Sequence, residues 1–156
     1  MNLEFEASVG GGIPILRTIK EGLATNKISK VYGILNGTCN YILSEMEITK
    51  DSFQNVLKKA QKLGYAEPGN PKLDLNGYDA MAKVKILSAL SFNKTISSNK
   101  SLMEGIENIE SKDFDIAEQL NLRIKLLGRT EIIDNKLFER VHPLSLIHIS
   151  EPTRPG

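Results

Sequence analysis

An aspartate and a lysine stand four residues apart in segment 76–92, which is otherwise strongly apolar. On a helix this spacing places Asp79 and Lys83 on one side, with Lys85 and Ser88 on the expected solvent side. The side of the pair also carries Ile86, Leu87 and Leu90. On a polar face such a pair would only stabilise the helix, by roughly 0.2–0.5 kcal/mol. On an apolar face desolvation makes the pair costly, which makes it a candidate functional site; the residues alone leave both interpretations open.

The segment before this helix, residues 65–75, carries three polar side chains that could bind a ligand, Glu67, Asn70 and Asp74. Its carboxylates could hold a ligand's ammonium group while the lysine exchanges a proton. The alternative is that Asp74 and Asn76 cap the next helix and that Glu67 is a solvated loop residue.

The elements that must position these residues are mixed helices and strands. Hydrophobic periodicity predicts strands at 3–9, 28–35, 122–133 and 136–144. It predicts helices at 14–24, from 38 onward, at 53–64, 76–92 and 112–121. Asp134-Asn135 predicts a tight hairpin turn between the last two strands. We therefore expect an α+β fold, with a mixed or antiparallel sheet and helices packed on one face.

Composition narrows the function classes. The 156 residues carry a net charge of +1, so a general nucleic-acid binder is not expected. Cys39 is the single cysteine, which excludes a disulfide or cysteine-zinc framework and fits a reducing cytoplasm. A buried thiol is favoured over a nucleophile for Cys39. We find no signal peptide and no apolar run of membrane-spanning length.

The glycine run in VGGGIP, residues 9–14, is similar to part of a dinucleotide-binding fingerprint. That fingerprint requires a glycine at position 15, where the chain has Ile15, and an acidic residue about 20 positions later, which is missing. A cation-binding or structural loop is therefore favoured over a phosphate-binding loop.

Four segments resemble the homoserine dehydrogenase family, in the family's order. They are FEASVGGGIPIL (5–16), GILNGTCNYIL (33–43), GYAEPGNPKLDLNGYDAMAK (64–83) and NLRIKLLG (121–128). The resemblance runs from about residue 4 to residue 143. It implies the interconversion of L-homoserine and L-aspartate 4-semialdehyde with NAD or NADP, a step of threonine and methionine biosynthesis.

The resemblance also implies roles for individual residues. Lys83 matches the proton donor and acceptor, and Asp79 matches its acidic partner. The matches to substrate-binding positions are Tyr65, Glu67, Thr38 and Asp74. The matches to a monovalent-cation site (Na⁺ or K⁺), built largely from backbone carbonyls, are Glu6, Val9, Gly11 and Ile13. The loop departs from the family pattern: Asn70 replaces an acid and one residue is added, so the register between Glu67 and Asp74 is open.

The resemblance implies a two-domain dehydrogenase that dimerises through the sheet of this domain. Residues 1–143 match part of its catalytic, substrate-binding domain. The Rossmann domain that binds the cofactor is not matched, so we expect no hydride transfer by this chain alone. The alternatives are a freestanding small-molecule-binding module or a purely structural dimerisation domain.

The end of the chain has a different character. Residues 144–154, LSLIHISEPTR, resemble the translation of a sequencing-library adapter. We therefore expect 144–156 to be an artefactual tail and give His148 no functional weight. The alternative is a strand followed by a Pro-rich tail.

Overall fold

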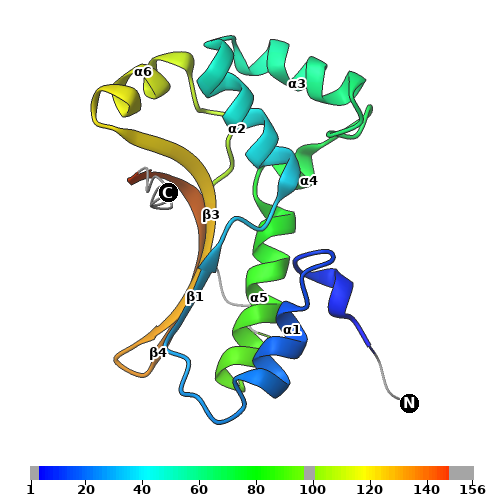
Figure 1. Cartoon of the computed structure of the whole chain (residues 1–156), viewed down its shortest axis with the longest axis vertical. Helices are drawn as coiled ribbons and strands as arrows, with labels where there is room; N and C mark the ends of the chain where they lie inside the picture. The colour runs from blue at the N-terminus through cyan, green and yellow to red at the C-terminus, as the bar shows by residue number, and fades with distance from the viewer. Residues whose placement is uncertain (1–3, 97–100, 148–156) are drawn as a thin grey trace, which may run out of the picture.

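The computed structural model describes residues 4–96 and 101–147. Its centre is a four-stranded sheet in the order β1-β3-β4-β2. The strands are β1 (Lys30–Gly33), β2 (Leu102–Met103), β3 (Leu122–Ile133) and β4 (Lys136–Ile147). β1 runs antiparallel to β3, and β2 runs parallel to β4. Helices pack against one face of this sheet (Figure 1), so the expected α+β fold is confirmed.

The longest pairing is the hairpin of β3 and β4, which are in register over their full length. Asp134 and Asn135 form its turn with φ of 49° and 61°. Asp and Asn tolerate this left-handed conformation, which a tight two-residue hairpin requires. The predicted hairpin is therefore confirmed.

Three of the helices begin at a residue whose side chain caps them. The structure has α1 (Ile15–Arg17), continued by the π-helical η2 (Thr18–Gly22), then α2 (Gly37–Thr49), α3 (Phe53–Lys62), α4 (Lys72–Leu75), α5 (Tyr78–Phe92) and α6 (Ser111–Gln119). Asn36 caps α2 and Ser52 caps α3, each accepting a hydrogen bond from a first-turn amide. Glu110 caps α6 together with Asp113. Helix α6 therefore begins at Ser111, one residue before the predicted start at 112.

Helix α5 forms the centre of the core, because it contacts both β3 and β4. Val84 is buried against Gly128, where a β-carbon would lie only 2.7 Å from the side chains of Val84 and Leu35. Glycine at 128 therefore lets the helix approach the sheet closely. Ser88 was predicted on the solvent side but is 1% exposed and shares a hydrogen bond with Thr130 of β3. The prediction was wrong because the apolar surface of α5 is broad, and periodicity does not say which side meets the sheet.

Three further differences separate the sequence prediction from the structure. Residues 6–8 of the predicted first strand form a 3-10 helix, η1 (Glu6–Ser8), since both carboxylate oxygens of Glu6 accept amides at the start of α1. The short β2 was missed, as was α4 within the predicted loop 65–75.

Strand β4 continues through Ile147 and pairs there with β3. It therefore extends beyond the predicted strand end at 144 and beyond residue 143, where the matched domain was expected to end. The assignment of 144–156 as an artefactual tail stays a prediction, and His148 lies outside the described residues. In the described part of the chain no helix has both the length and the apolar character needed to cross a membrane.

Candidate functional site

The acid and base singled out from the sequence form an ion pair on α5. Lys83 Nζ lies 2.6 Å from Asp79 Oδ2, and the two side chains are 23% and 32% exposed. The same Nζ donates a hydrogen bond to the carbonyl oxygen of Leu35, 3.0 Å away. An ammonium group has three N–H donors, so one remains after these two contacts. The pair is neither fully buried nor free in solvent, and it lies on the flank of α5 next to the junction of β1 and α2.

Asn36 connects this pair to the preceding loop. Its Nδ2 donates to Asp74 Oδ1 at 2.8 Å and to Asp79 Oδ2 at 2.9 Å. Its Oδ1 accepts the amide of Cys39 at 2.8 Å, and the residue is 5% exposed. Sequence reasoning missed Asn36 as a site residue. The available signal was an asparagine at a helix start, which predicts the cap but not contacts 38 and 43 residues away.

Asp74 does not cap α5, so the capping alternative was wrong for this residue. The residue before α5 is Gly77, whose φ of 88° suits glycine and which supplies no side-chain cap. Asp74 instead lies in α4, and its carboxylate faces Asn36. Asn76 accepts the amide of Tyr78 through its side chain, which is a local contact at the helix start.

A pocket of about 710 Å³ opens beside the Lys83–Asp79 pair. Four of the predicted site residues line it together with Lys83: Thr38, Tyr65, Asp74 and Asp79. Thr38 Oγ1 donates to the carbonyl oxygen of Tyr65 at 2.8 Å. The ring of Tyr65 stacks on Tyr41 with centroids 4.3 Å apart. The structure therefore brings together residues from the start of α2, the loop after α3, α4 and α5.

Glu67 lies in a neighbouring pocket of about 470 Å³, which it lines with Asn70, Asp74 and Asp79. The two pockets share Asp74 and Asp79. The backbone carbonyl of Glu67 accepts a hydrogen bond from Gln61, and its side chain is exposed. Glu67 is therefore adjacent to the Lys83 pocket but does not line it.

The four residues predicted to bind a monovalent cation line neither of these two pockets; they lie around η1 and the start of α1. Glu6 uses both carboxylate oxygens to accept the amides of Leu16 and Arg17, at 2.9 and 2.8 Å. The carbonyl of Ile13 accepts the amide of Ile15 at 2.7 Å, and Val9 is 1% exposed. Gly11 has a φ of 58°, which a glycine adopts readily. Among the described residues, no group of three or more His, Cys, Asp or Glu side chains could hold a metal ion. The carbonyl-based site stays a prediction.

Comparison with known proteins assigns the family. The model of the homoserine dehydrogenase family matches residues 14–152. The chain belongs to the homoserine dehydrogenase family. The resemblance predicted from the sequence motifs is thereby confirmed.

Homoserine dehydrogenases from several bacteria are similar to this chain. That of Neisseria gonorrhoeae is 48% identical over 141 residues, 90% of this chain and 32% of the relative. That of Bacillus subtilis is 40% identical over 155 residues, 94% of this chain and 36% of the relative. A crystal structure of a homoserine dehydrogenase from Thiobacillus denitrificans superimposes with a TM-score of 0.87 and 46% identity, covering 90% of this chain and 32% of that one. This chain thus spans about a third of the length of these homoserine dehydrogenases.

The cysteine next to the site is buried. Cys39 is fully buried and donates to the carbonyl of Asp74 at 3.2 Å. Burial, and then the negative charges of Asp74 and Asp79, raise the pKa of Cys39 to about 12. The thiol therefore stays protonated at neutral pH, and the prediction of a buried thiol is confirmed.

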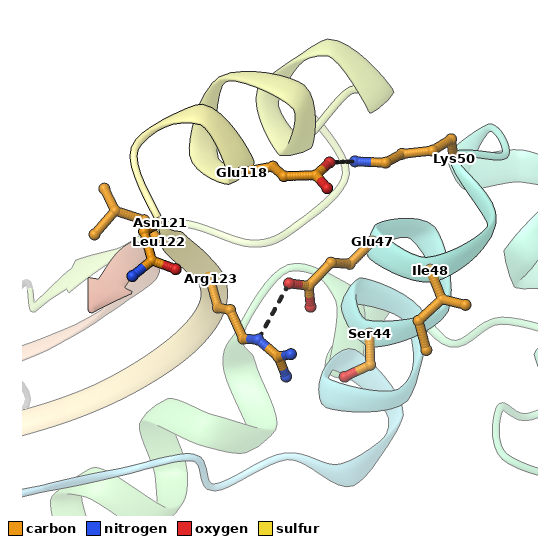
Figure 2. A pocket seen from close by; sticks show the side chains of 8 residues that line it. All are labelled: Ser44, Glu47, Ile48, Lys50, Glu118, Asn121, Leu122 and Arg123. Atoms are coloured by element: carbon orange, nitrogen blue, oxygen red, sulfur yellow. Dashed lines mark hydrogen bonds and ion pairs between the residues drawn. The ribbon is translucent and has the colours of Figure 1, made fainter. Parts of the chain in front are cut away.

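A separate pocket of about 350 Å³ lies between the end of α2, α6 and the start of β3. Figure 2 shows Lys50 directed toward Glu118 and Arg123 toward Glu47, with N–O distances of 2.7 and 3.4 Å. These charges neutralise one another within the protein. The pocket contains none of the residues predicted to bind substrate, and we assign it no role in the reaction.

Proposed function

We propose that this chain is the substrate-binding part of a homoserine dehydrogenase, an oxidoreductase that interconverts L-homoserine and L-aspartate 4-semialdehyde in threonine and methionine biosynthesis. The observation that carries the proposal is the Lys83 amine, paired with Asp79 and the Leu35 carbonyl at the wall of a polar pocket. Family membership supports the assignment of the reaction.

The residues of this chain act on the proton rather than on the hydride. A bound nicotinamide cofactor supplies or accepts the hydride. When the aldehyde is reduced, the Lys83 ammonium donates a proton to the oxygen that becomes the hydroxyl. When the alcohol is oxidised, the amine accepts that proton. Asp79 and the Leu35 carbonyl orient the amine and leave its third N–H for the substrate.

The carboxylates beside the amine suit the other end of the substrate. Asp74 and Glu67 line the two adjoining pockets and can attract the ammonium group of an amino acid. Thr38 and Tyr65 line the same pocket as Lys83 and would contact the rest of the substrate. This arrangement would hold homoserine with its hydroxyl at Lys83.

We propose that NAD or NADP binds mainly outside this chain. The glycine loop at 9–14 lacks the fingerprint of a phosphate-binding turn. A hyperthermophilic archaeal homoserine dehydrogenase, 25% identical with a TM-score of 0.72, has been solved as a mutant in complex with NADPH. A monovalent cation (Na⁺ or K⁺) at Glu6, Val9, Gly11 and Ile13 belongs to the same proposal, as does a cytoplasmic location.

The same proposal includes a homodimer formed through the sheet face that α5 leaves uncovered. Gly128 faces α5, so its neighbour Arg129 and the residue opposite, Tyr32, face away from the helices. Tyr32 is 67% exposed. Leu102, 59% exposed, lies on the edge strand β2. Exposed large apolar groups on a sheet face are typical of an interaction surface.

A chimera tests the reaction. Residues 4–143 of this chain replace the matching segment of the Neisseria gonorrhoeae homoserine dehydrogenase, which retains the rest of its own chain. We expect the chimera to oxidise homoserine with NAD or NADP, and Lys83→Ala to lower kcat by about 10²- to 10⁴-fold. Lys58→Ala, on the exposed side of α3, is the control and should leave kcat unchanged.

Two results would overturn the proposal. The first is a folded chimera without homoserine-dependent reduction of the cofactor. The second is full activity of Lys83→Ala, which would instead favour a binding or dimerisation module.

A further inference from the structure

Two consecutive residues hold the ion pair of α5 from the same side. The backbone carbonyl of Leu35 accepts from Lys83, and the side chain of Asn36 donates to Asp79. Both residues belong to the short junction between the end of β1 and the start of α2. The amine and the carboxylate are therefore fixed relative to one rigid segment rather than only to each other.

Both N–H donors and the oxygen of the Asn36 side chain are engaged in hydrogen bonds. Its nitrogen carries two N–H donors, which go to Asp74 and Asp79. Its oxygen accepts the amide of Cys39 and caps α2. Because the residue is 5% exposed, water has little access to compete for these contacts. A buried side chain with all its contacts made holds one orientation.

The carboxylates of Asp74 and Asp79, which both accept a hydrogen bond from Asn36 Nδ2, line the pocket that contains Lys83. Like charges that lie close together disfavour each other's ionised form, whereas donated hydrogen bonds favour it. Asn36 supplies one such bond to each carboxylate. Asp79 Oδ2 thus accepts from both Asn36 and Lys83, at 2.9 and 2.6 Å.

We propose that Asn36 is a positioning residue for proton transfer: its amide fixes the Asp79 carboxylate, and through it the Lys83 amine, while holding Asp74 at the pocket wall. This inference rests on the proposed function. Without the amide, Asp79 is free to rotate about its side-chain bonds, and the amine loses its aligned partner.

The competing explanation is that Asn36 only caps α2. Aspartate and serine are about as good at a helix N-cap as asparagine. Asn36→Asp and Asn36→Ser therefore keep an acceptor for the Cys39 amide but remove the two N–H donors. Asn36→Asp also adds a negative charge, and Asn36→Ser does not. The pair of variants separates capping from positioning.

Kinetics in the chimera form the first arm of the test. We expect both variants to lower kcat by about 10- to 100-fold, the usual effect of losing a group that orients a reacting one. Asn36→Asp should lower kcat at least as much as Asn36→Ser, because it also places a negative charge beside Asp74 and Asp79. Ser52→Ala, which removes the cap of α3 outside the site, should lower stability and leave kcat unchanged.

The second arm does not depend on activity. NMR couplings that report the χ1 rotamer of Asp79 are measured in the 156-residue chain. The wild type should show one Asp79 rotamer, whereas Asn36→Ser and Asn36→Asp should show averaging over several, because the amide that fixes the carboxylate is gone. An inactive wild-type chimera would count against the proposed function, while the Asp79 rotamer would still decide the role of Asn36. Wild-type kcat together with a single Asp79 rotamer in both variants would overturn the inference and leave Asn36 as a helix cap.

Discussion

The hydroxyl of Thr38 donates a hydrogen bond to the carbonyl oxygen of Tyr65, 2.8 Å away, and joins the first turn of α2 to the loop after α3. The Tyr65 ring then stacks on Tyr41, one turn further along α2. Thr38, Tyr41 and Tyr65 all line the pocket that contains Lys83, so these contacts hold part of its wall in place. Tyr65 is 55% exposed, and its backbone amide also donates to the carbonyl oxygen of Ala60, 2.9 Å away.

Thr38→Val keeps the branched shape of the side chain but removes the hydroxyl. A typical hydrogen bond contributes about 1 kcal/mol, so we expect the KM for homoserine in the chimera to rise about 3- to 10-fold, with a smaller change in kcat. Steady-state kinetics measure this split. Thr49→Val removes a comparable hydroxyl, which donates to the Glu45 carbonyl within α2, and should leave KM unchanged. Equal KM values for the two variants would contradict a role for the Thr38–Tyr65 contact.

The buried thiol makes stability depend on pH in the alkaline range. The pKa of Cys39 is raised from an ordinary value of 9.0 to about 12, mainly by burial. Below pH 9 the thiol is protonated in both the folded and the unfolded chain, so it does not change the free energy of unfolding. Between about pH 9 and 12 only the unfolded chain loses the proton, so stability falls by up to about 1.4 kcal/mol per pH unit.

Urea unfolding of the wild type and of Cys39→Ala at pH 8 to 10.5 measures this contribution. The variant removes the thiol but leaves the lysines and tyrosines that also titrate in this range. We expect the wild type to lose stability more steeply than the variant above pH 9. Parallel slopes would mean that the thiol ionises in the folded protein.

Gly105 lies against the backbone of the segment that precedes α5. A β-carbon at this position would overlap the carbonyl oxygen of Leu75 and the α-carbon of Asn76. Backbone cannot move aside as a side chain can, so Gly105→Ala should cost about 3 kcal/mol or more. Gly22→Ala, where the new carbon meets only the Thr18 side chain at 3.8 Å, should be neutral or slightly stabilising.

Thermal unfolding of the two glycine variants measures the difference. Gly105→Ala should also disturb the candidate site, because the segment it displaces, Leu75 and Asn76, lies between Asp74 and Asp79. A wild-type Tm for Gly105→Ala would show that the two backbones are not in contact.

The sheet face opposite α5 predicts how copies of the protein associate. Tyr32→Glu places a charge on the proposed dimer surface, on the edge strand β1, where burial without a partner is costly. We expect sedimentation velocity to show a dimer for the wild-type chimera and a monomer for the chimera that carries Tyr32→Glu. Ile48→Glu, at a 77% exposed position on α2 away from this face, is the control and should remain dimeric. A monomeric wild-type chimera would remove the dimer from the proposed function.

The parts of the fold that were predicted correctly depend on local chemistry. The β3–β4 hairpin follows from alternating residues on either side of Asp134-Asn135, and the Asp79–Lys83 pair follows from helical spacing alone. The role of Asn36 was not predictable, since its partners are distant in sequence and become neighbours only when α2 and α5 pack together. The predicted first strand failed because alternation around Glu6 cannot reveal that its carboxylate caps α1.

Strand β1 forms one edge of the sheet and also positions the junction that contacts the Lys83–Asp79 pair. Its pairing with β3 ends at Gly33. Leu35 and Asn36, which hydrogen-bond to the Lys83–Asp79 ion pair of α5, follow within three residues. Sliding β1 by one position along β3 would reverse which side of the ribbon its side chains occupy, and would carry the Leu35 carbonyl and the Asn36 amide away from their partners. The register of β1 on β3 thus fixes the distance between this junction and the Lys83–Asp79 pair. On the proposed function, a shift of that register would lower the reaction rate before it unfolded the protein.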